Sequence, residues 1–342
     1  MNPRLRNIVL LAVVAIVAIG LPFVVSTPDN GYQALNLSYA LTFAVAIMGL
    51  NILTGYSGQV SLGHGAFIAV GAFVAAIGVH YYNLPWPLTI PLAGVIAGFF
   101  GFLIGIPALR LEGIYLALAT FALGVAAPTV LKKPGQLGGV RGIILPPVTS
   151  PIDGIGDEQF FYFVTLVVAA ILFLVAWNLL RGRTGRALRA IRDGELAARA
   201  FGVDLPSYKT LAFAVSAAYA GVAGALYGLL TSFVSADAYP FQLSIQILIG
   251  AIIGGISTLE GAIFGGLFAW YLPVLSQQFL LPINKQLANA APTVTQGVIL
   301  LIVMFLARQG VAGLLRRGYY ELRVRFFESD ADATPEGAAV QT

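Results

Sequence analysis

The sequence has no cysteine, only two histidines and very few charged residues. Of its 342 residues, 10% are charged and 58% are hydrophobic, whereas a soluble domain carries about 25% charged residues. A soluble protein of this length could not cover its surface with so few charges. The missing cysteines exclude disulfides and thiol chemistry, and the sparse histidines and acids suggest no metal cluster or catalytic triad. We therefore expect no catalytic residues, no metal, no cofactor and no enzyme activity in this chain.

A second absence is local: no Asp, Glu, Lys or Arg occurs between Asn30 and Leu109. The apolar runs here and farther along the chain are long enough to cross about 30 Å of hydrocarbon as helices. Strands of a membrane barrel would instead alternate apolar and polar residues in segments of about ten. The sequence thus predicts an all-α, polytopic transmembrane helical bundle. We expect spans near residues 8–25, 34–54, 62–82, 87–107, 114–131, 160–180, 210–232, 243–258, 261–281 and 291–307.

The placement of basic residues predicts the orientation, because cytoplasmic loops are enriched in Lys and Arg. Residues 181–209 hold seven basic residues against three acidic ones, so we expect this loop in the cytoplasm. The same rule predicts two cytoplasmic termini and an outer loop at 132–159, although Lys132, Lys133 and Arg141 count against the latter. The basic residues near the termini are Arg4, Arg6, Arg308, Arg316, Arg317, Arg323 and Arg325. The net charge of +4 gives no reason to expect nucleic-acid binding.

The two ends of the chain differ in character. The N-terminal run "MNPRLRNIVLLAVVAIVAIGLPFVV" favours a retained first span over a cleaved signal peptide, since no clear small-x-small cleavage site follows it. The tail at 318–342 ends in the acidic and polar sequence "ESDADATPEGAAVQT". Such a composition predicts a disordered cytoplasmic tail.

One polar stretch, "GYSGQVSLGHG" at residues 55–65, interrupts the apolar runs. Polar side chains at membrane depth are costly unless they face protein, water or one another, and non-helical backbone there must be buried or line a cavity. Gln59, Ser61 and His64 are therefore candidates for the lining of a translocation path. The alternative is a tight turn between helices, with glycines for close packing and His64 hydrogen-bonded in the interface.

A weak internal repeat links this stretch to a second one. "SLGHGAF" at 61–67 resembles "STLEGAI" at 257–263, and each follows one apolar run and opens another. Corresponding glycine-interrupted segments in the two halves of a transporter point to its substrate path, although chance also explains so short a match. Ser257 and Glu260 are thus further path candidates. The alternative for Glu260 is a span end that faces cytoplasmic water.

The basic loop contains a predicted amphipathic helix over residues 184–202. Thr184 is the expected N-cap and Gly202 the expected terminator, with apolar residues at helical spacing between them. Two roles stay open on spacing alone: a helix that lies on lipid headgroups, or a helix that docks into a groove on a soluble partner. The apolar positions are Ala187, Leu188, Ile191, Ala198 and Phe201.

This loop and the helix after it resemble those of branched-chain amino-acid ABC transporter permeases of the LivM type. The stretch "GRALRAIRDGELAARAFGVDLPSYKTLAFAVSAAYAGVAGALYG" carries the family's residues in order. "LNILTGYSGQVSLGHGAFIAVGAF", "RLEGIYLALATFALG", "LSIQILIGAIIGGISTLEGAIFGGLF" and "QGVILLIVMFLARQGVAGLLRR" agree as well, so the resemblance covers roughly residues 34–317. The matching residues of the loop are Gly185, Arg186, Ala187, Ala190, Ile191, Arg192, Glu195, Ala197, Ala198 and Gly202, followed by Tyr208 and Lys209.

The resemblance implies that residues 184–202 form a coupling helix, seated in a cleft of an ATP-hydrolysing subunit. It implies four partner subunits in all: a second related permease subunit, two cytoplasmic ATP-binding subunits and an extracytoplasmic solute-binding protein, assembled at the inner membrane. Residues 1–317 would then form the transmembrane permease domain. The chain itself contains no G-x-x-x-x-G-K-[ST] phosphate loop, so an ATP-driven transporter would take its energy from such partners.

The implied substrate is a branched-chain or related amino acid, and the alternative is urea or another amide, because related importers carry them. Leu137 and Glu260 depart from the family's usual residues, which leaves the substrate open. A stand-alone, ion-coupled secondary transporter would need charged residues deep in its spans, and the charge-free stretch counts against it. The lack of an acid–base cluster disfavours an integral-membrane enzyme.

Overall fold

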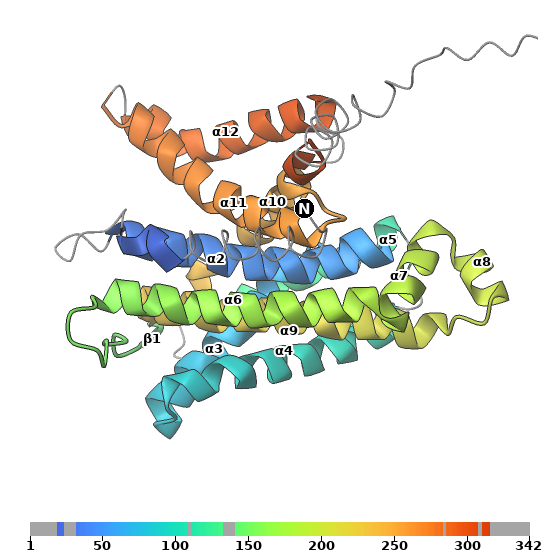
Figure 1. Cartoon of the computed structure of the whole chain (residues 1–342), viewed down its shortest axis with the longest axis horizontal. Helices are drawn as coiled ribbons and strands as arrows, with labels where there is room; N and C mark the ends of the chain where they lie inside the picture. Colours follow the sequence, from blue (N-terminus) through green and yellow to red (C-terminus); the bar gives the residue numbers. More distant parts are fainter. Residues whose placement is uncertain are drawn as a thin grey trace, which may run out of the picture.

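The computed structural model describes residues 19–23, 32–108, 111, 113–132, 141–282, 285–306 and 310–314. These residues form an all-α bundle with one short two-stranded sheet at one end (Figure 1). Eight helical segments are long and apolar enough to cross a membrane. They are α2 (Tyr32–Leu50) with its π-helical extension (Asn51–Tyr56), α3 (His64–Tyr82), α4 (Trp86–Ala108), α5 (Ile114–Leu131), α6 (Asp157–Arg181), α9 (Leu205–Thr231), α10 (Phe241–Gly254) with the preceding 3-10 turn (Ala236–Ala238), and α11 (Leu259–Leu280).

These eight segments coincide with eight of the predicted spans, because length and hydropathy are strong local signals. A further helix, α12 (Lys285–Leu306), covers the last predicted span, but its apolar part is shorter, Ala291–Val303. The first predicted span, near 8–25, lies mostly outside the described residues. The tail at 318–342 lies wholly outside them.

Helix α9 lies at the centre of the bundle, where it contacts α2, α3 and α4 (Figure 1). It is rich in glycine and alanine, and small residues allow helix backbones to approach closely inside a membrane. A Cβ at Gly224 would lie 1.9 Å from the carbonyl oxygen of Ile68, and one at Gly71 would lie 2.0 Å from that of Gly221. Close packing of α3 on α9 therefore requires glycine at both positions.

Two breaks meet at one end of the bundle: one follows the π-helical end of α2, and the other separates α10 from α11. Asn51 Nδ2 donates a hydrogen bond to the carbonyl oxygen of Thr258 at 2.9 Å. A Cβ at Gly55 would lie only 1.7 Å from the carbonyl oxygen of Ile256. The π-helical end of α2 is thus in direct contact with the second break.

Part of the predicted outer loop, residues 141–156, is described and crosses the opposite end of the bundle (Figure 1). Its strand β1 (Ile143–Ile144) pairs antiparallel with β2 (Phe233–Val234). At the same end, Lys132 Nζ lies 2.6 Å from Asp237 Oδ1. This lysine, which counted against an outer position for the loop, therefore has an acidic partner.

The prediction of one helix over residues 184–202 is wrong, because the structure has two helices there. They are α7 (Arg183–Asp193) and α8 (Glu195–Ala200). Gly194 separates them with φ 172° and ψ 107°, an extended conformation that leaves the helical region. Glycine has a low helix propensity, so the break occurs at this residue.

The predicted cap at Thr184 is also wrong. Helix α7 begins at Arg183, so Thr184 already lies inside its first turn. The predicted terminator is confirmed: Gly202 has φ +80°, and Val203 N donates to the carbonyl oxygen of Ala198 at 3.0 Å. This is the hydrogen-bond pattern of a glycine that ends a helix.

Candidate functional site

A buried polar cluster occupies the first break and contains three of the predicted path residues. Gln59, Ser61 and His64 are exposed by only 6%, 1% and 1%. His64 Nε2 donates to the carbonyl oxygen of Ala46 at 2.9 Å, and Gln59 Nε2 donates to Ser57 Oγ at 2.8 Å. Ser61 Oγ is buried without a hydrogen-bond partner among the described residues. These contacts fit the packing alternative, and a role on a translocation path stays a prediction.

Two hydroxyl groups from other helices complete this cluster. Thr120 Oγ1, from α5, accepts from Leu62 N at 2.9 Å, and Ser244 Oγ, from α10, accepts from Gly65 N at 2.8 Å. Both satisfy backbone N–H groups at the start of α3, which have no partner inside the helix. Sequence reasoning missed Thr120 and Ser244. The available signal was weak: each is a lone hydroxyl residue inside an apolar run.

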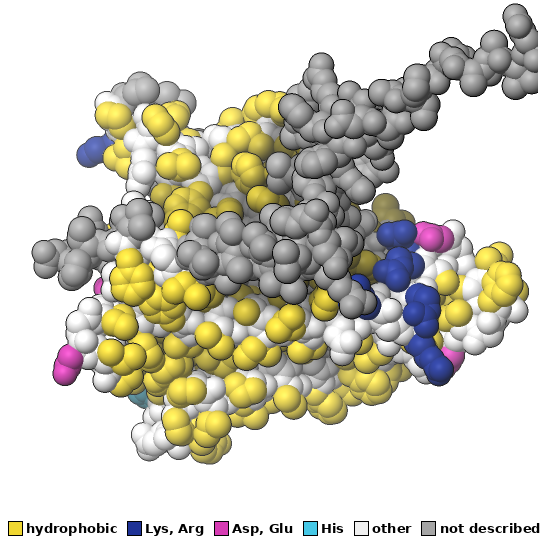
Figure 2. Space-filling model, viewed as in Figure 1, with side chains coloured by type: hydrophobic (Ala, Val, Ile, Leu, Met, Phe, Trp, Pro, Cys, Tyr) yellow, Lys and Arg dark blue, Asp and Glu magenta, His cyan; other side chains and the backbone are white. Residues whose placement is uncertain are grey.

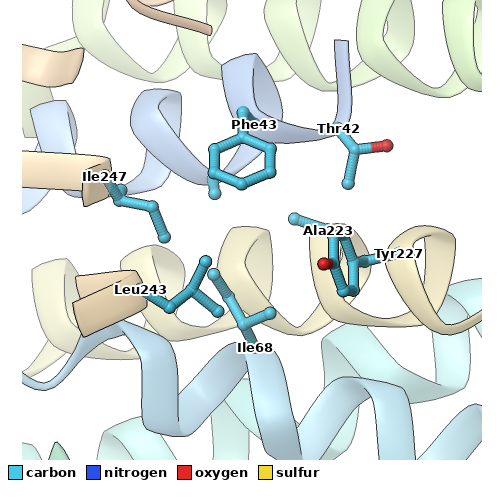
Figure 3. A pocket seen from close by; sticks show the side chains of 8 residues that line it. Thr42, Phe43, Ile68, Ala223, Tyr227, Leu243 and Ile247 are labelled. Carbon is cyan, nitrogen blue, oxygen red and sulfur yellow. The ribbon is translucent and has the colours of Figure 1, made fainter. Parts of the chain in front are cut away.

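A small cavity lies in the middle of the bundle, between α2, α3, α9 and α10 (Figure 3). Its free volume is about 10 Å³, which is about the space that one water molecule needs. It is too small for an amino acid, so the bundle is closed at this point. None of the predicted path residues lines the cavity, whose walls are Thr42, Phe43, Ala46, Ile68, Ala223, Tyr227, Leu243 and Ile247.

The two path residues predicted at the second break lie apart from the buried cluster. Ser257, in the break itself, and Glu260, in the first turn of α11, are both exposed. An acidic side chain in the first turn of a helix is favoured by the helix dipole. The position of Glu260 thus fits the alternative of a span end that faces solvent, and its role on a translocation path stays a prediction.

Helices α7 and α8 are tied to the bundle by two charged side chains. Arg192 Nη1 donates to the carbonyl oxygen of Gly55 at 3.1 Å. Glu195 Oε1 lies 2.6 Å from Nζ of Lys209, whose side chain is only 7% exposed. Two of the predicted coupling residues, Arg192 and Glu195, therefore face the bundle and hold the α7–α8 element in place.

The outer side of the same element carries different residues. Leu196 is 83% exposed and Phe201 is 89% exposed, whereas Ala187, Leu188, Ile191 and Ala198 are buried, so of the predicted apolar positions only Phe201 faces away from the described chain. Figure 2 shows basic side chains over α7 and a hydrophobic group over α8. Of the remaining predicted coupling residues, Gly185, Ala187, Ile191 and Ala198 are buried, Ala190 is half-buried, and Arg186, Ala197 and Gly202 are exposed.

Helix α5 is the most exposed of the eight apolar segments, since only 17% of its 18-residue apolar stretch is buried. Its exposed residues include Ala119, Ala122 and Ala126, at a spacing of three and four. Large side chains are exposed on α5 as well, among them Tyr115 and Leu118, as they are on α4 and α6. Small residues allow another helix to approach closely, so the three alanines are the part of α5 that suits contact with another helix.

Comparisons with known proteins agree with this architecture. A family described as "Branched-chain amino acid transport system / permease component" matches residues 34–307. The high-affinity branched-chain amino acid transport system permease protein LivM of Escherichia coli (strain K12) is 32% identical over 300 residues, which cover 80% of this chain and 69% of LivM. LivH of the same organism is 24% identical, covering 80% of this chain and 91% of LivH. The autoinducer 2 import system permease protein LsrC of Enterobacter sp. (strain 638) is 28% identical, covering 82% and 83%. No solved structure matches the chain.

Proposed function

Because this multi-pass membrane protein belongs to the family of branched-chain amino acid transport permeases, we propose that it is the permease subunit of an ATP-driven importer in the inner membrane. One observation carries the proposal beyond the family: the α7–α8 element is anchored to the bundle on one side and presents exposed apolar side chains on the other. Such an element suits the transfer of force from a soluble partner to the spans.

The soluble partner would be a pair of ATP-hydrolysing subunits. Leu196 and Phe201 project from the end of the bundle where the loop is rich in arginine, which the distribution of basic residues predicts to be cytoplasmic. Burying one such side chain in a partner's cleft would contribute about 1.5–3 kcal/mol. The observation favours an ATP-driven transporter over a stand-alone secondary transporter, which needs no docking element.

A second permease would pack along α5. The exposed face around Ala119, Ala122 and Ala126 supports this partner, since it allows two helices to approach closely. The cavity inside the bundle is far too small for a solute. A path bordered by α5 of this chain and by the second permease would avoid the closed core.

The proposed substrate is a branched-chain amino acid or a close relative, delivered by an extracytoplasmic binding protein. The LivM and LivH relatives, both named for branched-chain amino acid transport, support this class. Because the chain is also similar to LsrC, which is named for autoinducer 2 import, the uptake experiment must include autoinducer 2 as well as amino acids. Urea and short amides belong in the same set as the alternative substrates.

The test is uptake by the complete importer in proteoliposomes. The chain would be purified with the proposed ATPase pair, second permease and binding protein from the same organism. We expect leucine, isoleucine or valine to be taken up only with ATP, and an ATPase variant without its phosphate-loop lysine to serve as the inactive control. Uptake by this chain alone without ATP would overturn the proposal. Uptake of urea or autoinducer 2 in place of amino acids would overturn the substrate class alone.

A further inference from the structure

We propose that residues 55–63 are a relay that passes movement of α7 to α5, with Arg192 and Thr120 as the positioning residues at its two ends. The inference rests on the proposed function, in which α7–α8 receives force from the ATPase and α5 borders the transport path. In this role the polar stretch transmits movement, which is distinct from both a packing turn and a substrate-binding segment.

The first end of the relay lies against α7. Arg192 Nη1 donates to the carbonyl oxygen of Gly55 at 3.1 Å. Gly58, with φ +75°, lies so close that a Cβ there would be 3.3 Å from the Cα of Arg192. The C-terminal turn of α7 thus contacts the relay through both a hydrogen bond and backbone packing, so α7 cannot move without moving these residues.

The middle of the relay is bonded to itself and to Leu53 and Thr54 in the π-helical end of α2. Gln59 N donates to the carbonyl oxygen of Leu53 at 3.2 Å, and Thr54 Oγ1 donates to the carbonyl oxygen of Gln59 at 3.0 Å. Gln59 Nε2 donates to Ser57 Oγ, which in turn donates to the carbonyl oxygen of Leu53 at 2.7 Å. Because satisfied polar networks are rigid, residues 53–59 move as a unit and transmit displacement, whereas the Ser61 hydroxyl takes no part in this network among the described residues.

The second end of the relay lies against α5. Leu62 N donates to Thr120 Oγ1 at 2.9 Å, and a Cβ at Gly63 would lie 2.4 Å from the carbonyl oxygen of Thr120. The buried residues of α5 include Leu116, Thr120 and Gly124, whose four-residue spacing places them on one helix face. A Cβ at Gly124 would also meet the Leu62 carbonyl oxygen at 3.3 Å. The otherwise exposed α5 therefore rests on the relay along this face.

The experiment compares uptake with ATP hydrolysis in the complete importer. Thr120→Val keeps the shape of the side chain but removes the acceptor for Leu62 N, and Thr120→Ser keeps that acceptor. We expect Thr120→Val to lower uptake per ATP hydrolysed about tenfold and Thr120→Ser to retain it. The matched control is Thr165→Val, because Thr165 is equally buried and, among the described residues, its hydroxyl bonds to the Phe161 carbonyl oxygen of its own helix. An unchanged ratio in Thr120→Val would overturn the relay.

A spectroscopic readout tests the same idea without depending on uptake. The chain has no cysteine, so Val125→Cys, which is exposed on α5 but lies outside the three alanines, accepts a single spin label before assembly. We expect ATP to change the label's mobility in the otherwise native chain and in Thr165→Val, but not in Arg192→Met or Thr120→Val. If ATP changes the label's mobility in Arg192→Met as much as in the native chain, the relay is overturned. This test remains available if Thr120→Val does not assemble. If the native importer shows no ATP-dependent uptake at all, the proposed function fails, and the two failures are distinct.

Discussion

Glu195→Ala and Lys209→Met remove the same ion pair, yet they are expected to destabilise the protein unequally. Glu195 Oε1 and Lys209 Nζ are 2.6 Å apart, and their side chains are 38% and 7% exposed. The first change leaves a buried ammonium group without its partner. The second leaves a carboxylate that water still reaches, and the methionine retains the apolar packing of the lysine stem.

The burial of Lys209 and the partial exposure of Glu195 determine how much unfolding free energy each variant is expected to lose. Removing one partner of a fully buried pair costs about 3–5 kcal/mol, whereas a solvent-exposed pair contributes about 0.2–1 kcal/mol. Because Glu195 is more than one-third exposed, screening by water places Glu195→Ala between these limits, at about 2 kcal/mol. Lys209→Met is expected to cost less than about 1 kcal/mol. The double variant should match Lys209→Met within about 0.5 kcal/mol, because no unpaired buried charge then remains.

The assay is reversible unfolding of the purified chain in detergent, with the free energy of unfolding as the measured quantity. Asp193→Ala is the matched surface control, since Asp193 is 66% exposed and pairs with Arg192, and its cost should stay below about 0.5 kcal/mol. A Lys209→Met variant at least as unstable as Glu195→Ala would refute the reasoning. So would a double variant whose cost is the sum of the two single ones.

Three shorter predictions follow from other contacts. Phe201→Ala should weaken binding of the ATPase subunit about tenfold or more in a pull-down titration. Leu174→Ala, which changes an exposed apolar residue within the α6 span, should not weaken it. Equal affinities of the two variants would contradict docking of the ATPase on Phe201. Gly55→Ala should lower the free energy of unfolding by at least about 1–3 kcal/mol, since its Cβ would meet a carbonyl oxygen, whereas Gly297→Ala has open space around it and should not destabilise. Ser61→Ala should leave the free energy of unfolding unchanged within about 1 kcal/mol, because the Ser61 hydroxyl has no partner among the described residues. Uptake should be unchanged as well. A loss of uptake without a loss of stability would indicate substrate contact instead.

The sequence predicted the spans well and the contacts between them poorly, for one physical reason. Length and hydropathy are properties of a single segment, so the eight apolar helices and the start of α3 near the polar stretch were accessible. The hydroxyl of Thr120 bonds to a residue 58 positions away, and that of Ser244 bonds to one 179 positions away. No local pattern encodes such a pairing. Arg192 and Glu195 illustrate the same limit, because their charge suggests a solvent-facing side, while their partners at Gly55 and Lys209 draw them inward.

The closed core and the exposed α5 together favour a path beside the bundle over one through it. Opening the central cavity would require α9 to separate from α3, where Gly224 and Gly71 hold the backbones in close contact. Moving α5 requires less, because it contacts the described chain less than the central spans do, through α3, α10 and residues 62–63. Motions draw on the regions with the fewest buried contacts. A transport cycle that moves α5 while α2, α3, α4 and α9 stay packed is therefore the one that disrupts least of the fold.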